Sequence, residues 1–362
     1  MTMPQCLRSF LAVTIALSLS ACSTVGYYAH LAHGEYALMH ARKSIDDVIA
    51  DPKTDPALKS KLELAEQARA FASDHLQLPR NRSYTRYADL HRAYATWNVF
   101  AAEEFSVEAL KHCFPLIGCI GYRGYYDRER AEKEAARLQK QGYETYIGGS
   151  TAYSTLGWFA DPILNTMIRW GDDELIGTIF HELTHQKIYI KDDTEFNESL
   201  AMFVQQEGLQ QWRELHGLAR ADVVELQHDE QFTALVLQTR ERLKTLYASN
   251  ESKDEMRQHK REEIERLRGN YFRLRDSDWH GDGSYDTWIN SDINNAKLAP
   301  FGLYNTWVSA FAALYKKQPL STDGVHDWSK FFGAAAAIGK LNADARKGAL
   351  RELANDQGLL NK

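Results

Sequence analysis

The sequence predicts an α+β fold that is predominantly helical, with a small antiparallel sheet and a long helical hairpin. Apolar residues recur at helical spacing over most of the 362 residues. Only three short stretches have the pattern of strands, at 97–100, 121–126 and 143–147. A hydrophobic fraction of 44% and a charged fraction of 25% are those of an ordinary globular protein. We expect one domain over residues 22–362.

The first 21 residues predict a lipoprotein signal peptide. The apolar run from Phe10 to Leu19 is too short to span a membrane, and Leu19-Ser20-Ala21-Cys22 has the form of a bacterial lipobox. We therefore expect Cys22 to be the lipidated first residue of the mature protein; the alternative is an ordinary signal peptide with a free Cys22. Several acyl chains anchor a protein stably. This predicts a lipid anchor in the envelope of a Gram-negative bacterium. The residue after Cys22 is Ser23 and not the aspartate that would favour retention in the inner membrane, so we expect the anchor in the outer membrane, facing the periplasm.

The four cysteines fit the same compartment. Cys6 leaves with the signal peptide and Cys22 is acylated, so that Cys113 and Cys119 remain. In the oxidising periplasm these two are expected to form a disulfide. A metal-binding role for Cys113 together with His112 is the alternative.

The remaining elements follow in chain order. Residues 22–80 predict N-terminal helices, broken at Pro52–Pro56 and stopped at Leu78-Pro79. Residues 128–141 predict a helix between two strands. Residues 229–275 predict the helical hairpin, with its turn at 249–252, and we expect a structural arm rather than a coiled-coil dimer site. Closing helices begin near Trp328.

The stretch His181-Glu182-Leu183-Thr184-His185 predicts a catalytic metal centre. Two histidines four residues apart lie on one face of a helix, so that both can bind one metal ion. The spacing is the zinc-peptidase pattern His-Glu-x-x-His, in which Glu182 acts as general base on a metal-bound water. Apolar residues at helical spacing and the acidic start at 172–174, with an aspartate N-cap, support the helix. The alternative is a surface helix with two incidental histidines.

Glu198, thirteen residues beyond His185, is the expected third ligand. A polar break at 191–194 and a second helical pattern from Phe196 would bring Glu198 back towards the histidines. A catalytic zinc takes three protein ligands and keeps one open position, so we expect one Zn²⁺ per chain. The alternative for Glu198 is a glutamate stabilised by the helix dipole. The competing carboxylates Asp192, Asp193 and Glu195 have the pattern of turn and cap residues.

These residues carry a family resemblance. Asn197-Glu198-x-x-Ala201 after His-Glu-x-x-His resembles the gluzincin zinc peptidases, although the interval after His185 is shorter than in thermolysin-like enzymes. The chain as a whole resembles a bacterial family of aminopeptidase-like lipoproteins assigned to the gluzincins. The similar segments are 97–103, 113–125, 152–162, 181–186, 196–201 and 294–304. The resemblance implies a zincin-like (gluzincin) fold and a peptidase, and its aminopeptidase label is itself an inference from similarity.

The resemblance also implies roles for residues outside the metal centre. An edge strand beside the zinc helix holds the substrate in gluzincins, which implies a substrate-facing strand or loop here. It consists of Tyr153, Ser154, Thr155, Leu156 and Gly157. The alternative is a buried turn ending at Asp161-Pro162. A downstream tyrosine or histidine stabilises the oxyanion; Tyr304 is the first choice, and His280 and His326 are reserves.

Exopeptidase specificity needs a carboxylate for the free α-amino group of the substrate. The sequence offers Glu103, Glu104, Asp161 and Asp173 and favours none of them. We therefore expect a zinc-dependent peptidase, and an aminopeptidase by resemblance alone. The alternatives are a non-enzymatic envelope lipoprotein, such as a chaperone or assembly factor, and an endopeptidase.

The expected partners are peptides and, through the lipid anchor, the membrane. A net charge of −6 and the lack of a basic run with interleaved aromatic residues exclude a nucleic-acid-binding protein. The sequence leaves the oligomeric state open.

Overall fold

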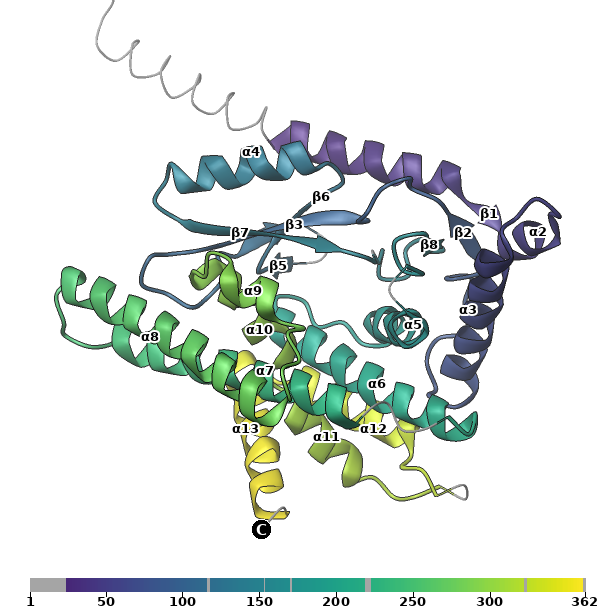
Figure 1. The fold of residues 1–362 in the computed structure, drawn as a ribbon. Coiled ribbons are helices and arrows are strands. Elements are labelled where there is room, and N and C mark those ends of the chain that lie inside the picture. Colours follow the sequence, from purple (N-terminus) through teal and green to yellow (C-terminus); the bar gives the residue numbers. More distant parts are fainter. Residues whose placement is uncertain are drawn as a thin grey trace, which may run out of the picture.

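A computed structural model describes residues 24–115, 118–152, 154–169, 171–218, 223–321 and 324–360. The expected signal peptide, Cys22 and Tyr153 lie outside these residues. The described part is predominantly helical with small sheets, as the sequence predicts (Figure 1). None of its helices is both long and apolar enough to cross a membrane.

The central sheet is antiparallel and has the strand order β6-β3-β7 (Figure 1). Its strands are β3 (Thr96–Ala102), β6 (Arg123–Tyr125) and β7 (Glu144–Ser150), each of which overlaps one of the three predicted strand regions. Helix α4 (Arg128–Gln139) covers one face of this sheet. Its small side chains at Ala131 and Ala135 share an apolar cluster with Val99 and Ala101 of β3. The other face of the sheet is therefore left to line a site.

The shorter strands are not predicted by the sequence, because two or three residues carry no measurable periodicity. They are β1 (Lys43–Ser44), β2 (Arg86–Ala88) and β8 (Ile163–Leu164) in one sheet, and β4 (His112–Phe114) with β5 (Gly118–Ile120) in a hairpin.

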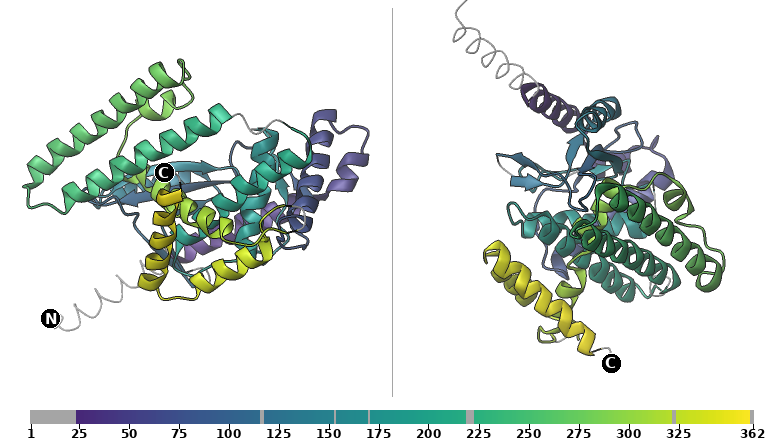
Figure 2. Two further views of the ribbon diagram at one scale, coloured as in Figure 1. Left: turned by 90° about the horizontal axis from the view of Figure 1, so that it is seen from below. Right: turned by 90° about the vertical axis from the view of Figure 1, so that its left-hand side faces the viewer.

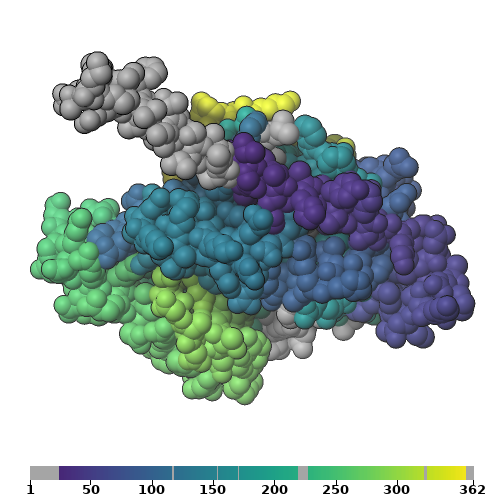
Figure 3. Space-filling model, turned by 90° about the horizontal axis from the view of Figure 1, so that it is seen from above, coloured from purple at the N-terminus to yellow at the C-terminus, as the bar shows by residue number. Residues whose placement is uncertain are grey.

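The N-terminal helices are residues 24–41, α2 (Ile45–Ala50) and α3 (Pro56–Asp74). Residues 24–41, named the roof helix here, run across the surface above the sheet (Figure 3). Tyr27 Oη donates a hydrogen bond to the Gly124 carbonyl of β6 at 3.1 Å. His30 Nε2 accepts one from the Tyr126 amide, also at 3.1 Å. The roof helix thus covers the outer edge of β6, which would otherwise be open to pairing.

The helices that carry the predicted metal centre are α5 (Asp172–Lys187) and α6 (Thr194–Leu215), which pack side by side (Figure 1). The aspartate N-cap expected for α5 is wrong: Gly171 holds that position, without a side-chain cap. The aspartates of the first turn instead pair with cations on neighbouring helices, Asp172 with Lys61 and Asp173 with Arg213. They therefore tie α5 to α3 and α6 while still complementing the helix dipole.

The helical hairpin consists of α7 (Val223–Tyr247) and α8 (Lys253–Arg273), which lie alongside one another and project from the body of the molecule (Figure 2). A capping box between Ser252 and Glu255 begins the second arm. Phe232, Leu267 and Tyr271 are buried in its core. Arg240 is buried too and donates hydrogen bonds to carbonyl groups outside the hairpin. The hairpin is thus an arm packed on the rest of the molecule.

The remaining helices complete the fold, and the last three of them lie at the bottom of Figure 1. They are η1 (Leu274–Asp278, a π-helical turn), α9 (Asp286–Asn290), α10 (Asn295–Asn305), α11 (Val308–Lys316), α12 (Trp328–Gly339) and α13 (Ala343–Leu360). α10 contacts both α6 and the central sheet, so that its side chains reach the space between them.

Candidate metal centre and cavity

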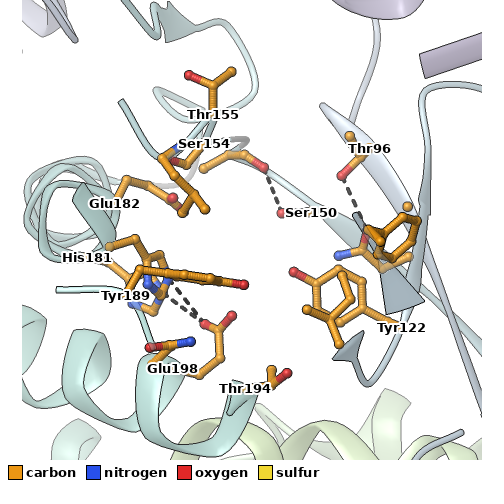
Figure 4. Close-up of a pocket in the computed structure, with 18 of the residues that line it drawn as sticks. Thr96, Tyr122, Ser150, Ser154, Thr155, His181, Glu182, Tyr189, Thr194 and Glu198 are labelled. Atoms are coloured by element: carbon orange, nitrogen blue, oxygen red, sulfur yellow. Dashed lines mark hydrogen bonds and ion pairs between the residues drawn. The ribbon is translucent and has the colours of Figure 1, made fainter. Parts of the chain in front are cut away.

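The structure brings His181, His185 and Glu198 together. The imidazoles project from one face of α5, and Glu198 projects towards them from the second turn of α6 (Figure 4). Glu198 Oε2 lies 3.2 Å from His181 Nε2 and 3.5 Å from His185 Nε2. One ligand atom from each residue lies within 4.8 Å of the others, and all three residues are buried. Among the described residues, these three form a group that can bind a metal ion.

A network of hydrogen bonds holds the short segment between α5 and α6 in place. The Asn197 carboxamide accepts a hydrogen bond from the Ile190 amide at 2.7 Å and donates one to the Ile190 carbonyl at 2.8 Å. Asp193 caps α6 by accepting from the Phe196 amide, and the buried Arg346 donates to the same carboxylate at 2.6 Å. This network explains how only thirteen residues can separate His185 from Glu198 in one site.

Gln205 orients the first histidine, and the sequence analysis did not identify this residue. Its Oε1 lies 3.1 Å from His181 Nδ1, so the Nδ1–H donates to the carboxamide and Nε2 turns its lone pair towards Glu198. Gln205 lies seven residues, two helical turns, beyond Glu198 on the same face of α6. That spacing is the signal that could have identified it.

The donor set fits a cation. With the Nδ1–H of His181 bound to Gln205, the Nε2 lone pair faces a carboxylate oxygen, and two acceptors are stable at 3.2 Å only with a proton or metal ion between them. Burial alone would raise the pKa of Glu198, but the adjacent His185 and His181 hold it at about 2. Burial opposes the charged form of His185 as well, yet Glu198 and then Glu182 raise its pKa. Glu198 is therefore ready to bind a cation as a carboxylate.

A cavity of about 670 Å³ lies beside this group. Its walls come from α5 and α6, from the face of the central sheet opposite α4 and from the roof helix. Glu182 lies on the wall next to His181, on the side facing Ser154 and Thr155 (Figure 4). A peptide-sized ligand in the cavity would thus meet the metal ligands and a separate carboxylate at once.

Three tyrosines surround the carboxylates of the site. Tyr304, from α10, lines the cavity with its ring stacked 6.4 Å from that of His181. Tyr122 and Tyr189 line it as well, and the sequence analysis did not single them out (Figure 4). Burial and then Glu198 raise the pKa values of all three, that of Tyr189 to about 12. Their hydroxyl groups consequently stay protonated at neutral pH and can donate hydrogen bonds.

The segment expected to be a substrate-facing strand or loop forms a turn in its described residues and no strand. Leu156 and Gly157 both have positive φ, at 55° and 81°. Asp161 organises the turn: its carboxylate accepts from the Thr155 hydroxyl at 2.7 Å, from the Thr155 amide at 3.1 Å and from Gln186 Nε2 at 3.3 Å. Ser154, Thr155 and Leu156 nevertheless line the cavity. The turn therefore shapes the cavity wall through side chains rather than through a strand edge.

The other sequence candidates lie elsewhere. Glu104 pairs with Arg257 of α8, Asp173 pairs with Arg213, Asp161 is committed to the turn, and neither they nor Glu103 line the cavity. The reserve histidines, His280 and His326, do not line it either.

Cys113 and Cys119 are joined by a disulfide across β4 and β5. The neighbouring residues Phe114, Pro115 and Ile120 form part of the cavity wall.

Comparison with known proteins gives one match. The sequence model of the family described as "Putative aminopeptidase" matches residues 26–350. No curated protein and no solved structure matches the chain. The matched region contains the metal-ligand group, the cavity and nearly all of the roof helix. The chain belongs to the putative aminopeptidase family, whose name indicates a peptidase that acts at amino termini.

Proposed function

We propose that this protein is a zinc-dependent aminopeptidase of the gluzincin type, with a zincin-like catalytic domain. The observation that carries the proposal is the buried group of His181, His185 and Glu198 beside Glu182 in a cavity wide enough for a peptide. Two histidines and one glutamate are a ligand set of catalytic zinc sites. When bound, zinc polarises a carbonyl group and lowers the pKa of a water molecule to roughly neutral.

The remaining chemistry belongs to residues of the chain. Glu182 takes a proton from the water that attacks the scissile carbonyl carbon, and then gives this proton to the nitrogen of the departing amine. The C–N bond breaks as the new carboxylate forms, so that no further reactant is needed. Negative charge develops on the carbonyl oxygen meanwhile, and a protonated phenol can stabilise it. Tyr304 is our choice because its ring stacks on that of His181.

The cellular setting is part of the proposal. The lipobox at Leu19–Cys22 supports a lipid anchor at Cys22, and the disulfide between Cys113 and Cys119 supports an oxidising compartment. We place the protein in the envelope of a Gram-negative bacterium, anchored in the outer membrane and facing the periplasm. Its substrates there are peptides.

The test combines metal analysis with digestion of a peptide library by the purified full chain. The wild-type protein should bind one zinc ion per chain and release residues from amino termini. Glu182→Gln should keep the metal and lower kcat/KM by about a hundredfold or more, because it removes the general base alone. The matched control is Glu129→Gln, an exposed glutamate of α4.

Two results would overturn the proposal. His181→Ala should lose the zinc, so retention of stoichiometric zinc in that variant would disprove the assigned ligands. A wild-type protein that carries zinc but cleaves no peptide would be a binding protein, as the non-enzymatic alternative requires.

A further inference from the structure

One carboxylate in the cavity takes no part in the metal centre. The carboxylates that line the cavity in the described part of the chain are Glu35, Glu174, Glu182 and Glu198. Glu198 faces the two imidazoles, and Glu182 is the proposed base. Glu174, near the start of α5, is exposed as a residue, although burial of its carboxyl group raises the pKa. Glu35 differs from the others because it comes from the roof helix.

The roof helix turns one face into the cavity. Tyr27, Leu31 and Glu35 follow one another at intervals of four residues, so they form a row along that face. Two members of the row are aromatic or aliphatic, and the third is a carboxylate. A glutamate is rarely buried beside apolar side chains unless a hydrogen-bond partner or an opposite charge compensates for its lost hydration.

The structure supplies only part of that compensation. Tyr126 Oη donates a hydrogen bond to Glu35 Oε2 at 2.9 Å. The other oxygen, Oε1, is buried and has no hydrogen-bond partner among the described residues. The guanidinium of the nearby Arg42 donates hydrogen bonds to the carbonyl groups of Met39 at 3.1 Å and Ala160 at 2.7 Å. A residue that lines the cavity thus has one carboxylate oxygen without a hydrogen-bond donor.

Gly34 shows how closely this arrangement is built. A Cβ atom at Gly34 would lie 2.0 Å from Cδ2 of Tyr126, so the ring that supports Glu35 occupies the space of a side chain. A glycine inside a helix lowers its stability by about 1 kcal/mol relative to alanine. The roof helix carries that cost at the one position where the Tyr126 ring needs room beside Glu35.

We propose that Glu35 binds the free α-ammonium group of the peptide substrate and so makes the enzyme an exopeptidase. This inference rests on the proposed peptidase function. An ammonium group offers the charge and the N–H donors that Oε1 lacks. The roof helix also occupies the Gly124 carbonyl of β6 through the hydroxyl of Tyr27. The number of residues removed in each step is then set by how many fit between Glu35 and the scissile bond.

Glu35 is a better candidate than Glu174 for a physical reason. An ammonium group bound at an exposed residue keeps much of its water and gains little, whereas a pair shielded from solvent is stronger and more selective. An acetylated amino terminus offers Oε1 no charge. It should therefore be rejected by a site built around Glu35.

The experiment uses the zinc-loaded full chain and two peptides of one sequence, one with a free and one with an acetylated amino terminus. We expect the wild-type protein to prefer the free peptide. Glu35→Gln should lower kcat/KM for the free peptide by about tenfold or more and leave the acetylated peptide unaffected, because a charged hydrogen-bonded pair is lost. The products, identified by mass, give the number of residues removed. Glu129→Gln serves as the matched surface control.

A binding measurement separates this inference from the proposed function. In metal-free protein carrying Glu182→Gln, calorimetry should show tighter binding of the free peptide than of the acetylated one, and the added change Glu35→Gln should abolish the difference. Equal discrimination with and without Glu35→Gln would overturn the inference even if hydrolysis is observed. Loss of discrimination in Glu174→Gln alone would assign the ammonium group to Glu174 and overturn it too. Failure of the wild-type protein to hydrolyse any peptide would count against the proposed function, while the binding result stands by itself.

Discussion

Gln205 and Asp161 act on the site through other residues. Gln205 Oε1 accepts a hydrogen bond from the Nδ1–H of His181 and thereby turns Nε2 of this histidine towards Glu198. Asp161 accepts four hydrogen bonds that hold the turn at 154–159 against the cavity. Gln205 lies 24 residues from His181 in the sequence, whereas Asp161 lies six residues from Thr155 and holds the turn that precedes it.

Asp161 makes the stability of the fold depend on pH. Burial raises its pKa from 3.8 to about 7, although hydrogen bonds from Thr155 oppose the rise. A carboxyl group whose pKa is higher in the folded than in the unfolded state stabilises the fold fully below the unfolded pKa. That contribution is lost as the pH rises through the folded value, and its upper bound is about 4 kcal/mol.

We therefore expect the difference in free energy of unfolding between wild type and Asp161→Asn to shrink from pH 4 to pH 8. Urea unfolding of metal-free protein at several pH values measures it. The asparagine keeps the shape of the carboxyl group and cannot titrate. A difference that stays constant over this range would contradict the assignment.

Among the elements, the β4–β5 hairpin supports the connection between α5 and α6. The Cys119 amide donates a hydrogen bond to Asp192 Oδ1 at 2.7 Å. Gly118 has a φ of 83°, and a Cβ atom there would lie 2.9 Å from the Asp192 amide nitrogen. The disulfide therefore closes a hairpin that rests on the segment between His185 and Glu198.

Removing the disulfide should weaken this support. We expect the double variant Cys113→Ser with Cys119→Ser to lose about 2 kcal/mol of stability, because a short closed loop constrains the unfolded chain modestly. Denaturant unfolding of the variant and of wild type, each with and without reductant, checks this. The reductant should affect wild type alone. Unchanged stability of the variant would show that the hairpin holds its place without the bond.

The elements differ in how far the sequence could predict them. α5, α6 and the α7–α8 hairpin each carry many apolar residues at helical spacing, which is a strong signal. The strands β1, β2 and β8 span two or three residues and give no such signal. In the site, the spacing of His181 and His185 on one helix could be read from the sequence. The meeting of Glu35 with Tyr126, 91 residues later, depends on tertiary packing and could not.

For the molecule as a whole, metal binding and folding are coupled. The three ligand residues come from two helices joined by a short connection, so the site exists only when α5 and α6 are packed together. A ligand that binds the folded state alone stabilises it, by about 4 kcal/mol at a thousand times its dissociation constant.

We accordingly expect a chelator to lower the Tm by several degrees, and added zinc to restore it. Differential scanning calorimetry of the full chain measures the shift. His181→Ala is the control, since its Tm should not respond to chelator or to zinc. An equal response in wild type and His181→Ala would place the stabilising metal at another site.

The position of the roof helix has a consequence for what this protein can reach in the cell. Under the proposed acylation of Cys22, only one residue of the sequence lies between the lipidated cysteine and residue 24, the first described residue of the roof helix that lines the cavity. Such an attachment leaves no tether with which to search the surrounding space. The mouth of the cavity would stay within a protein's width of the bilayer, and the peptides trimmed would be those released or displayed beside that surface.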